Sequence, residues 1–191
     1  HKEINDRLTK IADEFSGACA SETPSGLASE DLSRFNSIEN HGDAPKIGIA
    51  CGGVSAAYAK EALSVLGHAA KQAASVAGAA GGECDEALPS YRFMQIGTPF
   101  PFPEARADEF LDSLDAVIVF EELDSVIEDG LVHVAGLRAA RGKSAPRVLG
   151  RASGACRDAG ENDADEIAER LNGFFDETLL RRAGVSGDEL V

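Results

Sequence analysis

The most hydrophobic short run in the chain is DAVIVF, at residues 115–120, and the segments on either side of it predict the rest of the fold. An apolar run of this length predicts a β-strand that is covered on both faces, like the inner strands of parallel sheets. Residues 103–114 predict a helix just before it, because Pro103 suits the first turn of a helix. The expected buried side of this helix is Ala107, Phe110, Leu111 and Leu114.

Two more strands are predicted upstream. Residues 46–51 (KIGIAC) form an apolar run that ends at a pair of glycines, and residues 91–96 (YRFMQI) form another. Between them we expect a helix that extends through the small residues 69–82 into a loop. The expected apolar stripe of this helix is Val54, Tyr58, Ala62 and Val65. The long connection suits parallel pairing of the two strands.

Two helices and a short strand are predicted downstream. The spacing Ser125-x-x-Glu128 fits a capping box that opens one helix, and Asn162 stands where it can cap the other. Residues 146–150 (PRVLG) predict one more strand between them. The expected buried residues are Ile127, Leu131 and Val134 in the first helix, and Ile167, Leu171, Phe174, Phe175 and Leu179 in the second. The alternation predicts a three-layer α/β fold: a mostly parallel sheet of about five strands with helices on both faces.

Residues 1–44 are predicted to precede this fold as a helix and an irregular linker. Residues 2–16 predict an amphipathic helix, and its apolar side needs a partner surface. That side is Ile4, Leu8, Ile11 and Phe15. Residues 17–45, rich in Ser, Gly, Asn, Asp and Pro, predict an irregular connector with a short helical turn around residues 31–35. We therefore expect one α/β domain over residues 45–191, C-terminal helix included.

The composition argues against several classes of protein. Of the 191 residues, 43% are hydrophobic and 27% charged, which is usual for a soluble globular domain. The net charge of −15 repels nucleic acid and anionic membranes. No apolar run approaches the ~20 residues that cross a bilayer, and no export signal is recognisable, so we expect a cytoplasmic protein. Position 1 is His and the only methionine is Met94, which favours a segment of a longer polypeptide.

The cysteines and histidines predict no metal site. The four cysteines are Cys19, Cys51, Cys84 and Cys156. No two of them have the close spacing of zinc or iron–sulfur ligands, and the four histidines are equally scattered. We expect four free thiols in a reducing compartment.

Ligands of doubly wound sheets bind beyond the carboxyl ends of the strands, so the residues there are the first candidates for function. Residues 51–53 (CGG) could place a thiolate at a helix N-terminus, but no phosphate-binding or nucleophile motif accompanies them, and a tight turn is favoured. Glu121 and Glu122 follow the central strand and point to opposite faces. We therefore expect one carboxylate to meet helix N-terminal amides or a neighbouring domain and the other to face water.

Residues 98–103 (TPFPFP) present two aromatic rings on a stiff, extended backbone, which suits an interdomain contact. The equal alternative is that both rings fill the core of their own domain. The candidate interdomain contact is therefore Thr98, Phe100, Phe102, Glu121 and Glu122.

A basic tract without acids covers residues 136–151. Its members are Arg138, Arg141, Lys143, Arg147 and Arg151. The tract could bind an anion such as CoA or a nucleotide, or dock an acidic surface. The favoured alternative is that it balances surrounding acids and a helix dipole.

Several motifs follow one another in a fixed order over residues 35–143. The strong ones are GIACGGVSAAY (48–58), EAL (61–63), GTPFPFP (97–103), FL (110–111), VIVFEEL (117–123) and VIE (126–128); FNSIE (35–39) and GK (142–143) are weaker. In letters, order and spacing they resemble the middle domain of the alpha subunit of indolepyruvate:ferredoxin oxidoreductases. The resemblance implies a domain like the C-terminal domain of transketolase.

The resemblance also implies an enzyme whose chemistry lies outside this chain. Members of the family oxidatively decarboxylate 2-oxoacids, typically aryl pyruvates, to acyl-CoA with thiamine diphosphate, and pass electrons through 4Fe-4S clusters to ferredoxin. Two other domains bind the thiamine diphosphate, one of them through magnesium and a Gly-Asp-Gly motif. Residues 42–44 (GDA) and 187–189 (GDE) do not supply that motif, and the cluster cysteines are absent from this chain.

We therefore expect a scaffold domain that is inactive by itself and holds no catalytic, cofactor-binding or metal-binding residue. Its expected partners are other domains of the same alpha subunit, a smaller beta subunit and ferredoxin. Indolepyruvate is the preferred substrate of the whole enzyme, and residues 69–82 and 144–161, which depart from the family pattern, leave other 2-oxoacids open. The alternatives are an anion-binding module that uses the basic tract and a thiol enzyme or hydrolase that uses Cys51.

Overall fold

One five-stranded sheet organises the computed structural model, which describes residues 2–15, 34–76, 88–157 and 161–182. The strands are β1 (Ile38–His41), β2 (Ile47–Gly52), β3 (Tyr91–Ile96), β4 (Ala116–Phe120) and β5 (Arg147–Leu149). Their order across the sheet is β1-β3-β2-β4-β5. Strands β2 to β5 run parallel, and β1 pairs antiparallel with β3. The predicted mostly parallel sheet is confirmed.

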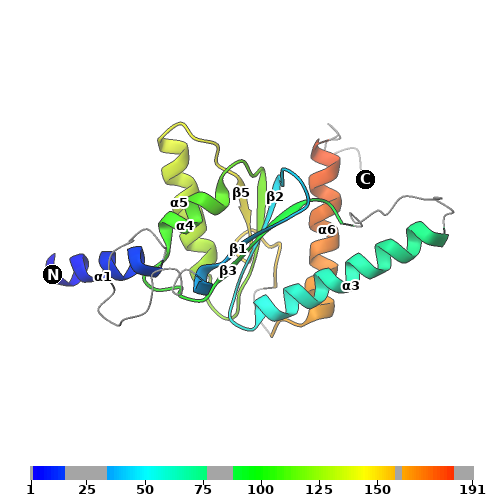
Figure 1. Cartoon of the computed structure of the whole chain (residues 1–191), viewed down its shortest axis with the longest axis horizontal. Helices are drawn as coiled ribbons and strands as arrows, with labels where there is room; N and C mark the ends of the chain where they lie inside the picture. The colour runs from blue at the N-terminus through cyan, green and yellow to red at the C-terminus, as the bar shows by residue number, and fades with distance from the viewer. Residues whose placement is uncertain (1, 16–33, 77–87, 158–160, 183–191) are drawn as a thin grey trace.

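Helices cover both faces of this sheet (Figure 1). Helices α3 (Ser55–Val76) and α6 (Ala164–Arg182) pack on one face, and α4 (Glu104–Leu111) and α5 (Val126–Ala140) on the other. Along β4 the side chains alternate between the two cores, with Ile118 and Phe120 in the first and Val117 and Val119 in the second. All of β4 is buried, as its apolar sequence predicts, and the three-layer α/β architecture is confirmed.

Glycine in β2 brings α4 close to the sheet. A Cβ at Gly48 would lie 2.7 Å from Leu114 Cδ1 and 2.8 Å from Phe110 Cζ, so no larger residue fits without moving them. Further along the same strand, a Cβ at Gly52 would collide with the Ile127 side chain at the start of α5. The two glycines therefore set how closely the second helical layer approaches the central strand.

The predicted apolar stripe of helix α3 is partly confirmed. Ala62 is buried and Tyr58 packs against the core, as expected, but Val54 and Val65 are 46% and 55% exposed. The buried residues of the helix are Ala56, Ala59, Ala62 and Leu63. Three of these four are alanines, whose small side chains let the helix lie close to the sheet and to α6, so an assignment from the larger residues places two valines on the side that packs although they face solvent.

The cap of α6 is also one residue away from its predicted position. Asp163 Oδ1 accepts a hydrogen bond from the Glu166 amide at 2.8 Å, which is the capping contact. Asn162 Nδ2 instead donates to Ser55 Oγ at 3.0 Å and to the Glu121 carbonyl at 3.2 Å. Asn162 thus ties the start of α6 to α3 and to the end of β4. The four aromatic and aliphatic residues predicted to be buried up to Phe175 are buried, but Leu179 is 47% exposed.

The sheet begins earlier in the chain than predicted. Strand β1 lies within the predicted connector and pairs Ile38 with Met94 and His41 with Tyr91. Its sequence, IENH, has a single large apolar residue, so no alternation marks it as a strand. Just before β1, the short helix η1 (Arg34–Asn36) overlaps the end of the helical turn predicted around residues 31–35. Residue 16, at the end of the predicted first helix, and residues 17–33 of the predicted connector lie outside the described residues.

Helix α1 (Lys2–Phe15) is amphipathic, as predicted, and none of its residues is buried. It extends away from the layers in Figure 1 and contacts them at its end, where the Phe15 and Phe35 rings lie 6.0 Å apart and Asn36 Nδ2 donates to the Phe15 carbonyl at 3.2 Å. Ile4 and Ile11 are 59% and 39% exposed. The apolar side of α1 thus remains open.

Candidate functional site

A crevice of about 470 Å³ opens at the carboxyl edge of the sheet. It lies where the chain changes direction: β3 is on one side of β2 and β4 on the other, so the loops that follow the three strands surround it. Its buried lining is Gly52, Ile96, Glu121 and Ile127. The crevice therefore occupies the position that the strand order predicts for a ligand or partner.

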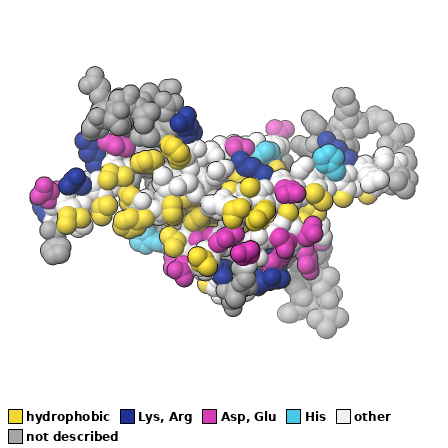
Figure 2. Space-filling model, turned by 90° about the horizontal axis from the view of Figure 1, so that it is seen from below, with side chains coloured by type: hydrophobic (Ala, Val, Ile, Leu, Met, Phe, Trp, Pro, Cys, Tyr) yellow, Lys and Arg dark blue, Asp and Glu magenta, His cyan; other side chains and the backbone are white. Residues whose placement is uncertain are grey.

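Large apolar side chains stand around this crevice in contact with solvent. Leu123 is 85% exposed, and Val54 and Val126, which also line the crevice, are about half exposed at 46% and 48%. Phe100, in the neighbouring loop, is 76% exposed. Figure 2 looks on to this edge of the molecule and shows hydrophobic side chains from α1 to the middle of the face, with acidic side chains among them. Exposed apolar groups gathered on one face are typical of interaction surfaces.

Glu121 holds the start of α5. Its carboxylate is 8% exposed and accepts hydrogen bonds from the Ile127 amide at 2.7 Å and the Glu128 amide at 2.9 Å. The predicted capping box is wrong, because the Ser125 side chain makes no capping hydrogen bond. Burial raises the pKa of the Glu121 carboxyl, more than the two amide hydrogen bonds lower it.

The two strand-end carboxylates have separate environments, as their alternation on the strand requires. Glu121 meets helix N-terminal amides, while Glu122 is half-buried and lines the crevice together with the exposed Asp124. The acidic side of the crevice therefore consists of Glu122 and Asp124, with Glu121 engaged by the helix.

Leu123 is held in an unusual backbone conformation at the rim. Its φ of 64° is in the left-handed region, which costs a side chain of this size about 1–2 kcal/mol. The Arg151 guanidinium donates a hydrogen bond to the Leu123 carbonyl. The loop is thus fixed so that a large apolar side chain projects into solvent. The sequence alone did not single out Leu123; the only signal is an apolar residue next to an acidic strand end.

The segment 98–103 divides its two aromatic rings between the core and the surface. Phe102 packs against Gly130 of α5, so closely that a Cβ on this glycine would lie 2.4 Å from Phe102 Cε2. Phe100 points outward. Thr98 is anchored by Asn36, whose Nδ2 donates to Thr98 Oγ1 at 2.7 Å and whose Oδ1 accepts from the Thr98 amide at 3.3 Å. The alternative that both rings fill the core of their own domain is therefore wrong for Phe100, and the interdomain contact stays a prediction.

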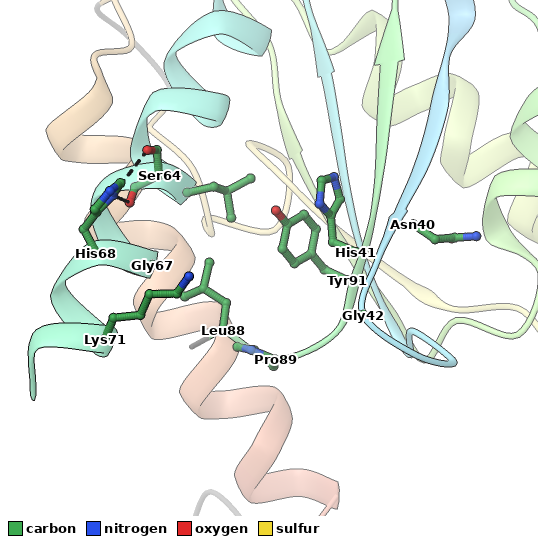
Figure 3. Close-up of a pocket in the computed structure, with 11 residues that line it drawn as sticks. Asn40, His41, Gly42, Ser64, Gly67, His68, Lys71, Leu88, Pro89 and Tyr91 are labelled. Atoms are coloured by element: carbon green, nitrogen blue, oxygen red, sulfur yellow. Dashed lines mark hydrogen bonds between the residues drawn. The ribbon is translucent and has the colours of Figure 1, made fainter. Parts of the chain in front are cut away.

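A second cavity, of about 480 Å³, lies at the opposite edge of the sheet (Figure 3). The His41 ring stacks on Tyr91, with centroids 4.5 Å apart, and faces the His68 and Lys71 side of α3. His68 Nδ1 lies 2.6 Å from the Ser64 carbonyl, so this ring is tied to its own helix. No sequence motif points to this cavity, because its residues are far apart in the chain.

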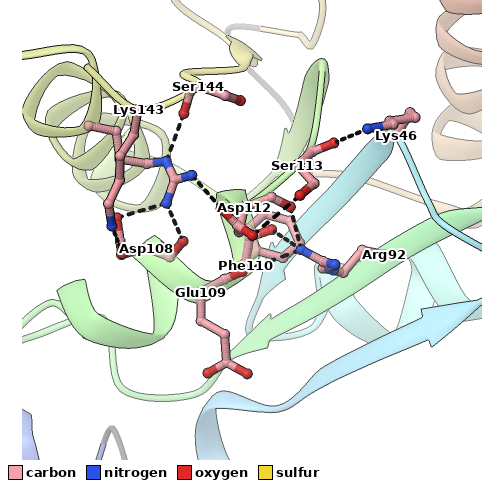
Figure 4. A network of polar contacts seen from close by, with 10 residues as sticks. Lys46, Arg92, Asp108, Glu109, Phe110, Asp112, Ser113, Lys143 and Ser144 are labelled. Atoms are coloured by element: carbon pink, nitrogen blue, oxygen red, sulfur yellow. Dashed lines mark hydrogen bonds and ion pairs between the residues drawn. The ribbon is translucent and has the colours of Figure 1, made fainter. Parts of the chain in front are cut away.

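Arg138 of the basic tract is an internal structural group. It is 1% exposed, and it donates to Asp108 Oδ1 and Asp112 Oδ1, both at 2.8 Å, and to the Ser144 carbonyl at 2.8 Å (Figure 4). Lys143 Nζ donates to the other oxygen of Asp108 at 3.0 Å. Hydrogen bonds from Lys143 and Arg138 hold the pKa of Asp108 below its usual range, and Arg138 does the same for Asp112.

Lys143 shares Asp108 with Arg138, whereas Arg147 and Arg151 have other partners. Arg147, at the start of β5, pairs with Glu177 of α6 at 3.4 Å. Arg151 follows the carboxyl end of β5 and bonds to Leu123, at the opposite edge of the sheet from Arg147. Arg141 is exposed at the end of α5. Four of the five cations thus have contacts within the chain.

The thiols of the described residues lie in the core. Cys51 is completely buried and faces the interior of the α3 side, and burial raises the pKa of its thiol far above the usual range. Burial also raises the pKa of Cys156 to about 12, and its Sγ donates to the Val119 carbonyl. Cys19 and Cys84 lie outside the described residues. Over the described ranges, no group of three or more His, Cys, Asp or Glu side chains could hold a metal ion, and no helix is long and apolar enough to cross a membrane.

Comparison with known proteins gives a consistent result. No family model matches the chain. The indolepyruvate oxidoreductase subunit IorA of Pyrococcus horikoshii is 35% identical over 99 residues, which is 52% of this chain and 12% of that protein. IorA of Thermococcus kodakarensis is 36% identical over 95 residues (50% and 11%), and IorA of Pyrococcus abyssi is 30% identical over 129 residues (68% and 14%). The resemblance read from the motifs is thereby confirmed: the chain is similar to a small part of IorA.

Proposed function

We propose that this chain is a non-catalytic docking domain within the alpha subunit of an indolepyruvate:ferredoxin oxidoreductase. The similarity to IorA supports the enzyme class. The whole enzyme would oxidatively decarboxylate a 2-oxoacid, with indolepyruvate or another aryl pyruvate preferred, to acyl-CoA. Thiamine diphosphate, magnesium and 4Fe-4S clusters would supply that chemistry from other domains, with a smaller beta subunit and ferredoxin as partners.

The side chains of the described residues do not fit those cofactors. A diphosphate in the carboxyl-edge crevice would face Glu122 and Asp124, whose charges repel it, and no group of three or more His, Cys, Asp or Glu side chains among the described residues could hold a bridging magnesium ion. Cys51 and Cys156 are buried apart from any surface at which a cluster could be exchanged or reached by ferredoxin. No step of the reaction is therefore assigned to this chain, whose role would be to position the domains that carry it out.

The observation that carries the docking role is the exposed apolar rim. Leu123 and Phe100 are among the most exposed large hydrophobic side chains in the described part of the chain, and both stand at the carboxyl edge. Such groups are normally covered by a partner when they cluster on one face. The open side of α1 belongs to the same face in Figure 2, so one neighbouring body could cover both.

The anion-binding alternative has no comparable observation in its favour. Its central cation, Arg138, is buried and bonded to two carboxylates of the same chain. The thiol-enzyme alternative needs a reactive Cys51 at neutral pH, whereas burial keeps this thiol protonated.

Hydroxyl-radical footprinting of the full-length alpha subunit tests the docking role. In a free domain, Leu123 and Phe100 would be oxidised readily, after correction for intrinsic reactivity, because they are 85% and 76% exposed. In the whole subunit we expect both to be protected relative to Val65 and Val132, which are 55% and 51% exposed on helices away from the edge. Oxidation of Leu123 and Phe100 at least as fast as that of the two valines would refute the proposal.

The inactivity of the isolated chain has its own test. The 191-residue chain supplied with indolepyruvate, CoA, thiamine diphosphate, magnesium and ferredoxin should give no acyl-CoA, while the complete alpha and beta subunits should give it under the same conditions. Turnover by the isolated chain would contradict the proposed non-catalytic role.

A further inference from the structure

The side chains around the carboxyl-edge crevice indicate the chemistry of what it receives. We infer that the crevice binds an apolar side chain flanked by Lys or Arg, contributed by another part of the same alpha subunit. This inference rests on the proposed docking role of the same edge and adds the identity of the contact.

The apolar part of the inference follows from the lining. The buried lining residues Gly52, Ile96 and Ile127 are apolar, and the carboxylate of the fourth, Glu121, is engaged by two amides of α5. The volume of about 470 Å³ is at the small end for ligand pockets. Gly52 lets the Ile127 side chain pack directly against β2, because a Cβ there would lie 2.4 Å from Ile127 Cδ1, and this contact forms the apolar floor of the crevice. Val54 and Val126 continue the apolar surface outward. A crevice of this kind gains most from one aliphatic or aromatic side chain that excludes water.

The basic part follows from the charges. Glu122 and Asp124 line the crevice, and no Lys or Arg is among its described lining residues. Glu121, just below them, already accepts two amide hydrogen bonds and gives the site a third negative charge when ionised. A docked Lys or Arg would offset one of the two negative charges of the outer carboxylates as the apolar group excludes water, so the apolar and cationic contacts reinforce each other.

The same charges argue against the other occupants. A second copy of the chain docked symmetrically through this edge would bring Glu122 and Asp124 against their equivalents, in a protein whose net charge is −15. An anionic ligand would meet the same repulsion. Charge complementarity with Glu122 and Asp124 therefore favours a cationic segment as the occupant. The region matched by this chain spans only 11–14% of the IorA relatives, so in the proposed alpha subunit the rest of the polypeptide can supply that segment.

The conformation of Leu123 gives this docking surface a fixed shape. Its left-handed backbone and the hydrogen bond from Arg151 to its carbonyl hold the loop between Glu122 and Asp124 in one arrangement. A partner therefore meets a preorganised pair of carboxylates around a projecting apolar side chain, and less ordering is needed on docking.

Charge reversal in the full-length alpha subunit tests the inference. The double variant Glu122→Lys/Asp124→Lys should raise the oxidation of Leu123 and Phe100 in hydroxyl-radical footprinting several-fold, because a basic partner would be repelled. The neutral variant Glu122→Gln/Asp124→Asn should raise it less, and the wild-type protection should weaken at high salt. The matched control is Asp176→Lys, an exposed acid on α6, which should leave the footprint unchanged.

Each outcome decides the question. Protection of the rim in the wild type that neither charge variant alters would mean that the edge docks a partner of different chemistry, which overturns this inference and leaves the docking role standing. A rim that is unprotected in the wild type overturns both. A dimer whose dissociation on dilution exposes the rim would identify a second copy as the occupant and overturn the inference. If core residues such as Met94 become oxidised in the lysine variant, that variant has unfolded. The neutral variant then decides alone, and we expect its Leu123 and Phe100 to be oxidised more than in the wild type.

Discussion

Arg138→Met tests whether the basic tract is part of the scaffold or a ligand site. The wild-type guanidinium joins α5 to the end of α4 through Asp108 and Asp112, and to the loop that follows through the Ser144 carbonyl. Methionine keeps most of the buried stem but removes the charge and every donor. The carbonyls of Asp108 and Ser144 then lose their partner in a site where Arg138 itself was 1% exposed.

The expected loss of stability depends on how far Asp108 and Asp112 remain in contact with water. Removing one member of a buried ion pair costs about 3–5 kcal/mol. Asp108 and Asp112 are 32% and 67% exposed, so water can solvate them after the substitution, and we expect the lower end, about 3 kcal/mol. For a chain of this size, about 2–4 °C per kcal/mol makes this a fall in Tm of roughly 6–12 °C.

The loss of stability caused by Arg138→Met should also depend on pH. The pKa values of Asp108 and Asp112 are lowered in the folded chain, so the folded state binds fewer protons than the unfolded state between the lowered and the ordinary pKa. Their contribution is therefore present above the ordinary pKa of 3.8 and is lost as the pH falls through the lowered values. The difference between wild type and Arg138→Met should be full at pH 7 and shrink in strong acid.

Urea unfolding followed by circular dichroism measures this difference, with the exposed Arg141→Met as the control. The structural reasoning would be refuted if Arg138→Met lost less than about 0.5 kcal/mol, the usual effect of a surface change, or no more than the control. A calorimetric titration with CoA on the same samples covers the alternative: saturable binding to the wild type that Arg138→Met abolishes without loss of stability would make the tract a ligand site.

Three further predictions concern the carboxyl edge and the core. Leu123→Asn should stabilise the isolated chain by about 0.5–1 kcal/mol, because Asn tolerates the left-handed backbone, and a lower urea midpoint would contradict this. Cys51 and Cys156 should resist iodoacetamide at neutral pH until the chain unfolds; rapid alkylation of Cys51 in the folded state, seen by mass spectrometry, would be inconsistent with its burial. Because the pKa of Glu121 is raised in the folded chain, this residue should favour folding most at low pH. The unfolding free energy of the wild type relative to Glu121→Gln should therefore fall as the pH rises from about 4.5 through the raised pKa. A difference that stays constant or changes in the opposite direction would disprove the raised pKa of Glu121.

The central strands could be predicted from the sequence because they are buried on both faces. The runs at residues 46–51, 91–96 and 115–120 each begin and end within one residue of β2, β3 and β4. Burial of both faces leaves a continuous apolar run, which is a local signal. Strand β1 gives no such signal, because an edge strand can be held by backbone hydrogen bonds and needs few apolar side chains.

The location of the crevice could be predicted, but its contacts could not. The strand alternation brings residues 51–53, 97–99 and 121–122 to one edge wherever the sheet is parallel. Caps and ion pairs depend instead on residues that are distant in the sequence. Arg138 looks like a free cation within its own stretch, and its partners Asp108 and Asp112 lie 30 and 26 residues earlier.

Strand β1 also bears on aggregation. The apolar pattern begins after Pro45, so a fragment cut there would retain the two cores but lose the strand that covers the outer side of β3. The unpaired backbone of Tyr91–Ile96 would then offer a flat, largely apolar edge to other copies, the usual starting point for intermolecular sheet growth. Four residues with mostly polar side chains thus protect the molecule from self-association. A proline at Glu39, which stands opposite Phe93 at a hydrogen-bonded position of the ladder, should compromise that protection more than any change of side-chain polarity there.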